Sequence, residues 1–278
     1  RLIKNGRITL FSPSDVPGLY DAFFQDQDKF EELYVKYEQD ESIRKKSIKA
    51  VDLFSSMMQE RASTGRIYIQ NVDHCNTHSP FNAAKAPIRQ SNLCLEIALP
   101  TKPLNDINDE NGEIALCTLA AFNLGEINEM DDFEELADLI VRALDSLLTY
   151  QNYPIKAAEI ASLRRRTLGV GVINYAYYLA KNGVRYSDGS ANGLTHRTFE
   201  AIQYWLLRAS NNLAKEQGAC EAFDETTYSE GILPIDTYKK EVDAFCDEPL
   251  HYDWEALRAD IKEHGLRNST LTALMPSE

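Results

Sequence analysis

Three side chains in one short segment have the chemistry of a catalytic site. In residues 90–96 (QSNLCLE), Asn92, Cys94 and Glu96 alternate with leucines. Successive side chains of an extended backbone point to opposite faces, so an amide, a thiol and a carboxylate would share one face. An amide can hold a hydroxyl, a thiol can do nucleophilic or one-electron chemistry, and a carboxylate can take a proton. The alternative is an amphipathic strand in which Cys94 is a small hydrophobe.

A second thiol lies in the next apolar segment. Cys117 belongs to residues 114–124 (IALCTLAAFNL), where a cysteine ordinarily fills a core. The loop-type residues 100–112 separate this segment from the first one. Two thiols on adjacent strands could meet in one pocket, which is the reason to keep Cys117 as a candidate.

Two other polar clusters carry weaker signals. Residues 74–78 (HCNTH) resemble a metal triplet but lack a fourth ligand, so a polar loop is favoured and no metal site is expected. The run Arg164–Arg166 precedes an apolar stretch, and a solvated helix end is favoured over a phosphate or carboxylate contact.

The elements that must position these residues alternate between helix and strand. Hydrophobic spacing predicts helices over residues 30–37, 48–62, 133–147, 195–217 and 254–264, and another helix that ends near Gly183. Asp28 and Asp253 are the expected N-caps of the first and last of these helices, and Gly65 is the expected stop of the second. Strands are predicted over residues 66–72, 91–99, 114–124, 168–173 and 268–275. Buried strands joined by helices indicate an α/β fold with a largely parallel sheet or barrel.

Composition excludes several classes of protein. The 278 residues hold 29 Lys and Arg against 43 Asp and Glu, a formal charge of −14, which argues against nucleic-acid binding. No apolar run is long enough to cross a membrane. Five scattered cysteines are too few for a disulfide scaffold and indicate reduced thiols in the cytoplasm. The chain starts at Arg1 without Met and stops after Pro276-Ser277-Glu278, so we expect a fragment of a longer protein.

Five segments together resemble one known family. Residues 66–78, 90–100, 115–118, 165–174 and 264–278 resemble the large (alpha) subunit of class I aerobic ribonucleoside-diphosphate reductases of the bacterial type. The resemblance covers essentially the whole chain in order. It implies one partial catalytic domain over residues 1–278, about half of a ten-stranded α/β barrel with a central finger loop. The N-terminal ATP-cone and the C-terminal redox tail of the family would lie outside the chain.

The resemblance also implies roles for individual residues. Cys94 matches the cysteine that becomes a thiyl radical and abstracts the 3′-hydrogen of the ribose, and Glu96 matches the base that takes the 3′-hydroxyl proton. Asn92 matches the amide that binds the ribose hydroxyls. Cys117 matches one member of a redox-active pair whose partner would lie upstream of Arg1. Ser277 and Glu278, the last two residues of the chain, match the start of the turn that holds the diphosphate.

The implied function is reduction of ribonucleoside 5′-diphosphates to 2′-deoxyribonucleoside 5′-diphosphates for DNA synthesis. The expected partners are a radical-generating, metal-containing small (beta) subunit, a second alpha subunit, thioredoxin or glutaredoxin as reductant, and nucleoside triphosphate effectors bound elsewhere. No cofactor is expected on this chain, and the fragment alone is expected to be inactive. The alternatives are a cysteine hydrolase, which needs a histidine beside Cys94, and a non-catalytic helical interaction domain.

Overall fold

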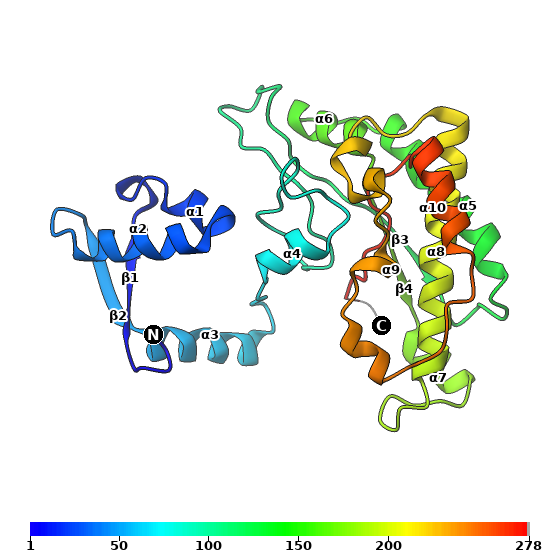
Figure 1. Cartoon of the computed structure of the whole chain (residues 1–278), viewed down its shortest axis with the longest axis horizontal. Helices are drawn as coiled ribbons and strands as arrows, with labels where there is room; N and C mark the ends of the chain where they lie inside the picture. Colours follow the sequence, from blue (N-terminus) through cyan, green and yellow to red (C-terminus); the bar gives the residue numbers. More distant parts are fainter. Residues whose placement is uncertain (277–278) are drawn as a thin grey trace. The chain divides into compact units, whose positions relative to one another are not determined.

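The computed structural model describes residues 1–276, and the chain forms two compact units, Arg1–Asp73 and His74–Glu278 (Figure 1). The first unit pairs strand β1 (Arg7–Phe11) with strand β2 (Lys45–Lys49) in antiparallel register. A short 3₁₀ helix (Pro13–Asp15) and helices α1 (Leu19–Gln25) and α2 (Gln27–Gln39) connect the two strands, and α3 (Ala50–Thr64) follows.

Capping explains where the helices of the first unit begin and end. The Asp26 side chain accepts a hydrogen bond of 2.9 Å from the Lys29 amide and starts α2, so the predicted cap at Asp28 was two residues late. Gly65 adopts a φ of 66° and ends α3, which confirms the predicted stop. Ile48 lies in β2 rather than in the helix, because its backbone pairs with Ile8 of β1.

The second unit holds the remaining regular elements. Its helices are α4 (Val72–His78, which begins at the unit boundary), α5 (Asp132–Tyr150), α6 (Lys156–Arg165), α7 (Tyr175–Lys181), α8 (Asn192–Gln217), α9 (Pro234–Thr237) and α10 (Trp254–His264). Short 3₁₀ helices span Phe223–Glu225, Thr227–Glu230 and Lys240–Ala244. Its strands are β3 (Thr118–Asn123) and β4 (Leu168–Ile173).

The two strands of this unit are parallel and lie at its centre (Figure 1). Strand β4 has the predicted bounds, and its first four residues are buried. On its other side, Val170 donates to the Leu271 carbonyl at 2.8 Å and accepts from the Ala273 amide at 3.1 Å. The predicted strand over residues 268–275 is thereby reduced to a single parallel bridge, Val170 with Thr272.

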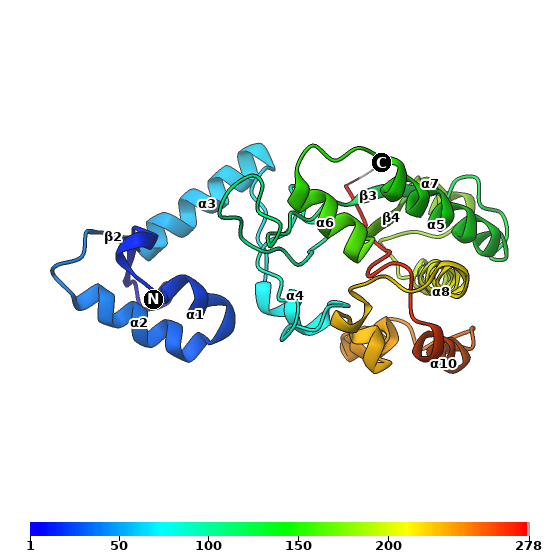
Figure 2. The ribbon, with the colours of Figure 1, turned by 90° about the horizontal axis from the view of Figure 1, so that it is seen from above.

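Helix packing in the second unit follows the predicted apolar faces. Helix α8 contacts both α5 and α10 (Figures 1 and 2). The buried face of α5 includes Phe133, Ala137, Val141 and Leu148, each fully buried. Burying each large side chain contributes roughly 1.5–3 kcal/mol to folding, so the α5–α8 contact is a main source of the unit's stability. The predicted helices over 133–147, 195–217 and 254–264 are confirmed.

Two predicted strands are absent. Residues 66–71 have no regular structure and Val72 begins α4, while residues 93–96 form a turn within the segment predicted as strand 91–99. Alternating hydrophobicity predicts which side chains share a face of a strand, but a strand also needs a neighbouring strand as its hydrogen-bonding partner. Neither segment pairs with another strand of the described residues, so neither prediction holds. The sheets of the described residues have two strands each, so helices and parallel strands are confirmed but a barrel is not. Within residues 1–276, no helix is long and apolar enough to cross a membrane.

Candidate active site

Residues 92–97 form a hydrogen-bonded loop rather than an extended strand. The backbone N–H of Asn92 donates to the Ile97 carbonyl at 3.3 Å, and the backbone N–H of Ile97 donates back to the side-chain Oδ1 of Asn92 at 3.4 Å. The Ser91 hydroxyl donates to the same Ile97 carbonyl at 2.8 Å. Leu95 takes a left-handed φ of 62°, a conformation that costs a non-glycine residue about 1 kcal/mol or more. These contacts close the base of what we call the 92–97 loop.

The loop brings the predicted amide and carboxylate into contact. Nδ2 of Asn92 donates a hydrogen bond to Oε1 of Glu96. The two side chains meet because a turn places residues four apart side by side, not because they share a strand face. Cys94 lies in the turn between them and is half-buried. Leu93 is 88% exposed, so this leucine does not form a buried apolar face opposite the polar side chains.

Glu96 has one oxygen that is available for a ligand. Its Oε2 atom is buried and has no hydrogen-bond partner among the residues that the structure describes. Leaving a buried acceptor unsatisfied costs about 1–3 kcal/mol, more for a charged group, unless a bound molecule donates to it. Glu96 also lines a pocket of about 410 Å³ together with Ile97, Ala98, parts of α4, and residues 227–237 and 270–272. This carboxylate can therefore accept a hydrogen bond or a proton from a ligand hydroxyl.

Cys117 is a neutral thiol within electrostatic range of Glu96. Burial, and to a smaller extent the charge of Glu96, raise the pKa of Cys117 to about 12. Cys117 immediately precedes β3 and faces Gly169 of β4, where an added Cβ would overlap the sulfur. The structure thus places the second candidate thiol near the carboxylate, although their segments are separated by the 100–112 loop.

The other predicted site residues have different outcomes. Ser277 and Glu278 lie outside the described residues.

His74 and His78 are on helix α4 rather than in a polar loop, with their rings 5.9 Å apart, and both line the 410 Å³ pocket. The cysteine hydrolase alternative needs a histidine hydrogen-bonded to Cys94. The hydrogen bonds that close the 92–97 loop in the described residues instead come from backbone groups, Ser91 and Asn92.

Arg165 and Arg166 are buried and Arg164 is partly buried, so the predicted solvated helix end is wrong. The alternative, a carboxylate contact, is confirmed. Arg165 is 1% exposed, and its Nε donates to Oε2 of Glu113 at 2.6 Å. Lys102 contacts the other oxygen of Glu113 at 2.7 Å. Burial raises the pKa of Glu113, but the hydrogen bonds from Arg165 and Lys102 outweigh it and leave this pKa below its ordinary value. Glu113 is therefore ionised and tied to the end of α6.

A second buried ion pair lies next to this one in sequence, and its acidic partner was not identified from the sequence. Arg166 binds both oxygens of Asp145, through Nε at 2.5 Å and Nη2 at 2.8 Å. Nδ2 of Asn268 donates to the same carboxylate at 3.1 Å and to the Arg166 carbonyl at 3.0 Å. Helix α5, the C-terminal end of α6 and Asn268 are joined here. The sequence held one indication of this ion pair, because Asp145 is a charged residue on the apolar face of α5.

Comparison with known proteins agrees with the resemblance. The family model described as the ribonucleotide reductase barrel domain matches residues 1–278. The chain is 79% identical to the ribonucleoside-diphosphate reductase subunit alpha of Haemophilus influenzae, covering all of this chain and 37% of that protein. It is 77% identical to the ribonucleoside-diphosphate reductase 1 subunit alpha of Escherichia coli and 53% identical to the subunit alpha of phage T4, covering all of this chain and 36% of each.

The chain spans about a third of the length of the curated relatives it matches. The match is continuous over both compact units and includes the 92–97 loop, Cys117 and the buried arginines. The chain therefore belongs to the ribonucleotide reductase family, within its barrel domain.

Proposed function

We propose that the protein to which this chain belongs reduces ribonucleoside 5′-diphosphates to 2′-deoxyribonucleoside 5′-diphosphates, with the 92–97 loop as its catalytic element. One observation carries the proposal: Asn92 fixes one oxygen of Glu96, while the other, Oε2, is buried and unpartnered among the described residues. A sugar hydroxyl is a donor that satisfies such an oxygen, and the neutral Cys117 thiol lies within range of the same charge. The names of the matched relatives support the reaction.

In this proposal each thiol has a separate task. A Cys94 thiyl radical takes the hydrogen atom from C3′ and becomes a thiol, and Glu96 takes the proton of the 3′-hydroxyl. The 2′-hydroxyl then leaves as water with one hydrogen from a dithiol, whose second hydrogen ends on C2′. Cys117 and a partner cysteine close to a disulfide, having given up two electrons and two protons. Cys94 returns its hydrogen atom to C3′ and Glu96 returns the proton to the 3′-oxygen, so the radical and the base are both regenerated.

The raised pKa of Cys117 fits this task. A thiol that stays protonated at neutral pH carries the hydrogen that the reaction consumes, whereas a thiolate would carry only the electrons. Burial is the larger cause of the shift, and a dry site also protects a radical from water. Besides binding the ribose hydroxyls, Asn92 orients the base in this proposal. Its side-chain amide contacts both the backbone of Ile97 and the carboxylate of Glu96.

The proposal includes partners that act on this chain. A separate metal-containing beta subunit supplies the radical, in keeping with the "subunit alpha" names of the relatives. Two alpha subunits form a homodimer, thioredoxin or glutaredoxin re-reduces the disulfide, and nucleoside triphosphates regulate the enzyme from sites outside this chain. Ser277 and Glu278 begin the diphosphate-binding turn. The five free cysteines fit a reducing, cytoplasmic setting.

The sharpest test of Glu96 is Glu96→Gln in the full-length alpha subunit assayed with its beta subunit. Glutamine keeps Oε1 as an acceptor for Asn92 but cannot take a proton, so kcat should fall about 10²-fold or more while thermal stability is kept. Glu110→Gln, at an exposed position of the 100–112 loop, is the matched control and should leave kcat unchanged. Wild-type turnover by Glu96→Gln would refute the role of Glu96 as the base.

A further inference from the structure

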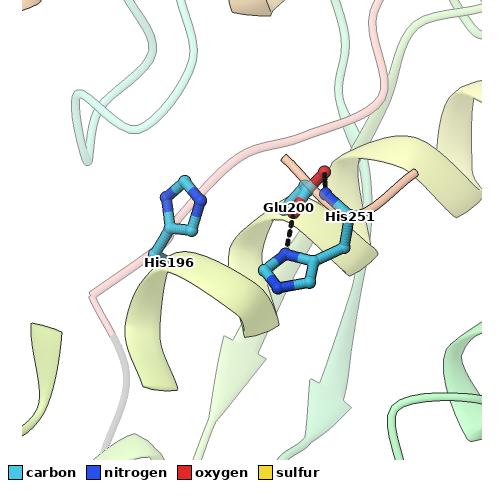
Figure 3. A group of neighbouring side chains, drawn as sticks. All are labelled: His196, Glu200 and His251. Carbon is cyan, nitrogen blue, oxygen red and sulfur yellow. Dashed lines mark hydrogen bonds and ion pairs between the residues drawn. The ribbon is translucent and has the colours of Figure 1, made fainter. Parts of the chain in front are cut away.

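Three side chains that do not belong to the 92–97 loop lie close enough together to share a metal ion. His196 and Glu200 lie one turn apart on α8, and His251 comes from the segment that precedes α10 (Figure 3). One ligand atom from each residue lies within 4.8 Å of the others. Residues four apart on a helix point from the same face, so the pair on α8 approaches His251 together.

Glu200 is held as an ionised carboxylate with one oxygen less occupied than the other. Its Oε1 atom accepts N–H donors from the His251 backbone at 2.8 Å, the Tyr252 backbone at 3.2 Å and the Trp254 ring at 3.0 Å. Among residues 1–276, the hydrogen-bond partner of Oε2 is Nδ1 of His251, at 3.0 Å. Burial raises the pKa of Glu200, but the bonds from Trp254, His251 and Tyr252 outweigh it and leave this pKa below its ordinary value. Oε2 is thus the oxygen oriented for a cation.

His196 contributes a nitrogen that has no other task. Its Nε2 atom is buried and has no hydrogen-bond partner among residues 1–276. Buried polar atoms are normally paired, so an isolated imidazole nitrogen facing a carboxylate–imidazole pair indicates a ligand between them. The ring centres of His196 and His251 are 6.4 Å apart. A single ion that binds one nitrogen of each ring needs a separation of this order.

We propose that His196, Glu200 and His251 bind a zinc ion through Nε2, Oε2 and Nδ1. Tetrahedral zinc with bonds of about 2.0–2.1 Å places its ligand atoms about 3.3 Å apart. Oε2 of Glu200 and Nδ1 of His251 already have nearly this spacing at 3.0 Å. Rotation of the His196 side chain closes the remaining distance, which is at most roughly 1.5 Å, and it breaks no hydrogen bond at Nε2. Two imidazoles and one carboxylate suit zinc, whereas magnesium and calcium prefer oxygen ligands.

The proposed ion has an entry path and a structural consequence. The His251 side chain is 44% exposed, so solvent reaches the cluster and water fills the fourth position. Zinc takes the place of the hydrogen bond between Nδ1 of His251 and Oε2 of Glu200, and the neutral imidazole then carries its proton on Nε2. The ion then joins residues 251–254 to α8. None of the three ligands belongs to the 92–97 loop, so this site and the proposed reductase chemistry can fail independently.

The binding test uses the full-length alpha subunit after chelator treatment, titrated with Zn²⁺ by calorimetry and with Co²⁺ by visible absorption. Compared with wild type, His196→Ala should lose one equivalent of bound Zn²⁺ per chain, or weaken its binding at least tenfold, and lose the associated Co²⁺ bands. The matched control is His264→Ala, which removes a surface histidine at the end of α10. Equal stoichiometry and affinity for wild type and His196→Ala would overturn the proposal.

A thermal measurement separates the metal site from a purely structural hydrogen-bond network. Zn²⁺ should raise the Tm of the wild-type subunit and of His264→Ala but not that of His196→Ala, whose metal-free Tm should match wild type. Glu200→Gln should lower Tm even without metal, because it weakens the contacts to residues 251–254. If Zn²⁺ leaves the wild-type Tm unchanged, residues 196, 200 and 251 form only a structural network and the proposal is wrong.

Discussion

Nδ2 of Asn92 donates a hydrogen bond to Oε1 of Glu96 across the turn that contains Cys94. The same asparagine closes the base of the loop through its backbone and Oδ1. One residue therefore sets both the shape of the loop and the direction of the carboxylate. Oε2 of Glu96 is left to a ligand, which is the geometric basis of the proposed reaction.

Asn92→Ala should lower kcat of the full-length enzyme about tenfold or more. It removes a hydrogen bond to a charged group, worth about 1.5–3 kcal/mol, that orients the base in the transition state. Steady-state kinetics with the beta subunit measures the change. Asn105→Ala is a matched control, because Nδ2 of Asn105 makes the same contact to Asp109, four residues on, at 2.8 Å in an exposed loop. Equal kcat values for the two variants would argue against orientation by Asn92.

Cys117 should react slowly with thiol reagents, and Glu96 should control part of that slowness. Since burial is the first cause of the raised pKa and the charge of Glu96 the second, Glu96→Gln should lower the pKa of Cys117 but leave it above that of an ordinary thiol. Alkylation of the reduced full-length subunit as a function of pH, followed by peptide mass spectrometry, measures this pKa. An unchanged profile in Glu96→Gln would place Glu96 too far from the thiol.

Gly169→Ala should destabilise the protein and displace the Cys117 thiol. A Cβ at this position overlaps the Cys117 sulfur and comes within 2.8 Å of Leu119 and 3.1 Å of Ala273. Overpacking of this kind typically costs about 1–3 kcal/mol. Gly183→Ala is the control: its backbone has a φ of 71° but no atom lies within 4 Å of the added Cβ. Denaturant unfolding and Cys117 alkylation should both change in Gly169→Ala, whereas the control should change only the unfolding midpoint.

Glu113→Gln should destabilise the protein by about 1–3 kcal/mol near neutral pH, since the buried Arg165 loses one of its two carboxylate partners and keeps Glu225 at 2.8 Å. The pKa of Glu113 is lowered on folding, so its stabilising effect is complete above the unfolded-state pKa and is lost as pH falls through the folded-state value. The gap between wild type and variant should therefore narrow in acid. Glu216→Gln, which breaks the exposed pair with Arg142, should have little effect at either pH. A gap that is constant from pH 7 to pH 3 would contradict this assignment.

Sequence patterns predicted those elements whose signal is local. The apolar stripe of α5, the Asp253 cap of α10 and the apolar run of β4 each specify their element without a distant partner. The strand predicted over 91–99 failed because alternation cannot distinguish a ladder from a turn with a left-handed residue such as Leu95. The sequence thus identified the chemical groups of the site but not the contact that joins them.

The buried arginines could not be predicted from their own segment. Three consecutive cations are typical of a solvated helix end, and their partners Glu113 and Asp145 come from segments that only the fold brings close. Asp145 was the one local indication, because it lies beside Leu144 on the buried face of α5. A charge on an apolar face predicts a buried counter-charge but not its identity.

The most direct test of the account is deoxyribonucleotide formation by the full-length alpha subunit carrying Cys94→Ser, in the presence of the beta subunit, reductant and effector. Serine is close in size to cysteine, but its hydroxyl does not supply a sulfur radical, so product formation should be abolished while folding and substrate binding remain. Cys246→Ser, in a segment remote from the 92–97 loop in sequence, should retain wild-type turnover. Sustained nucleotide reduction by Cys94→Ser would show that the Cys94 sulfur does not start the reaction.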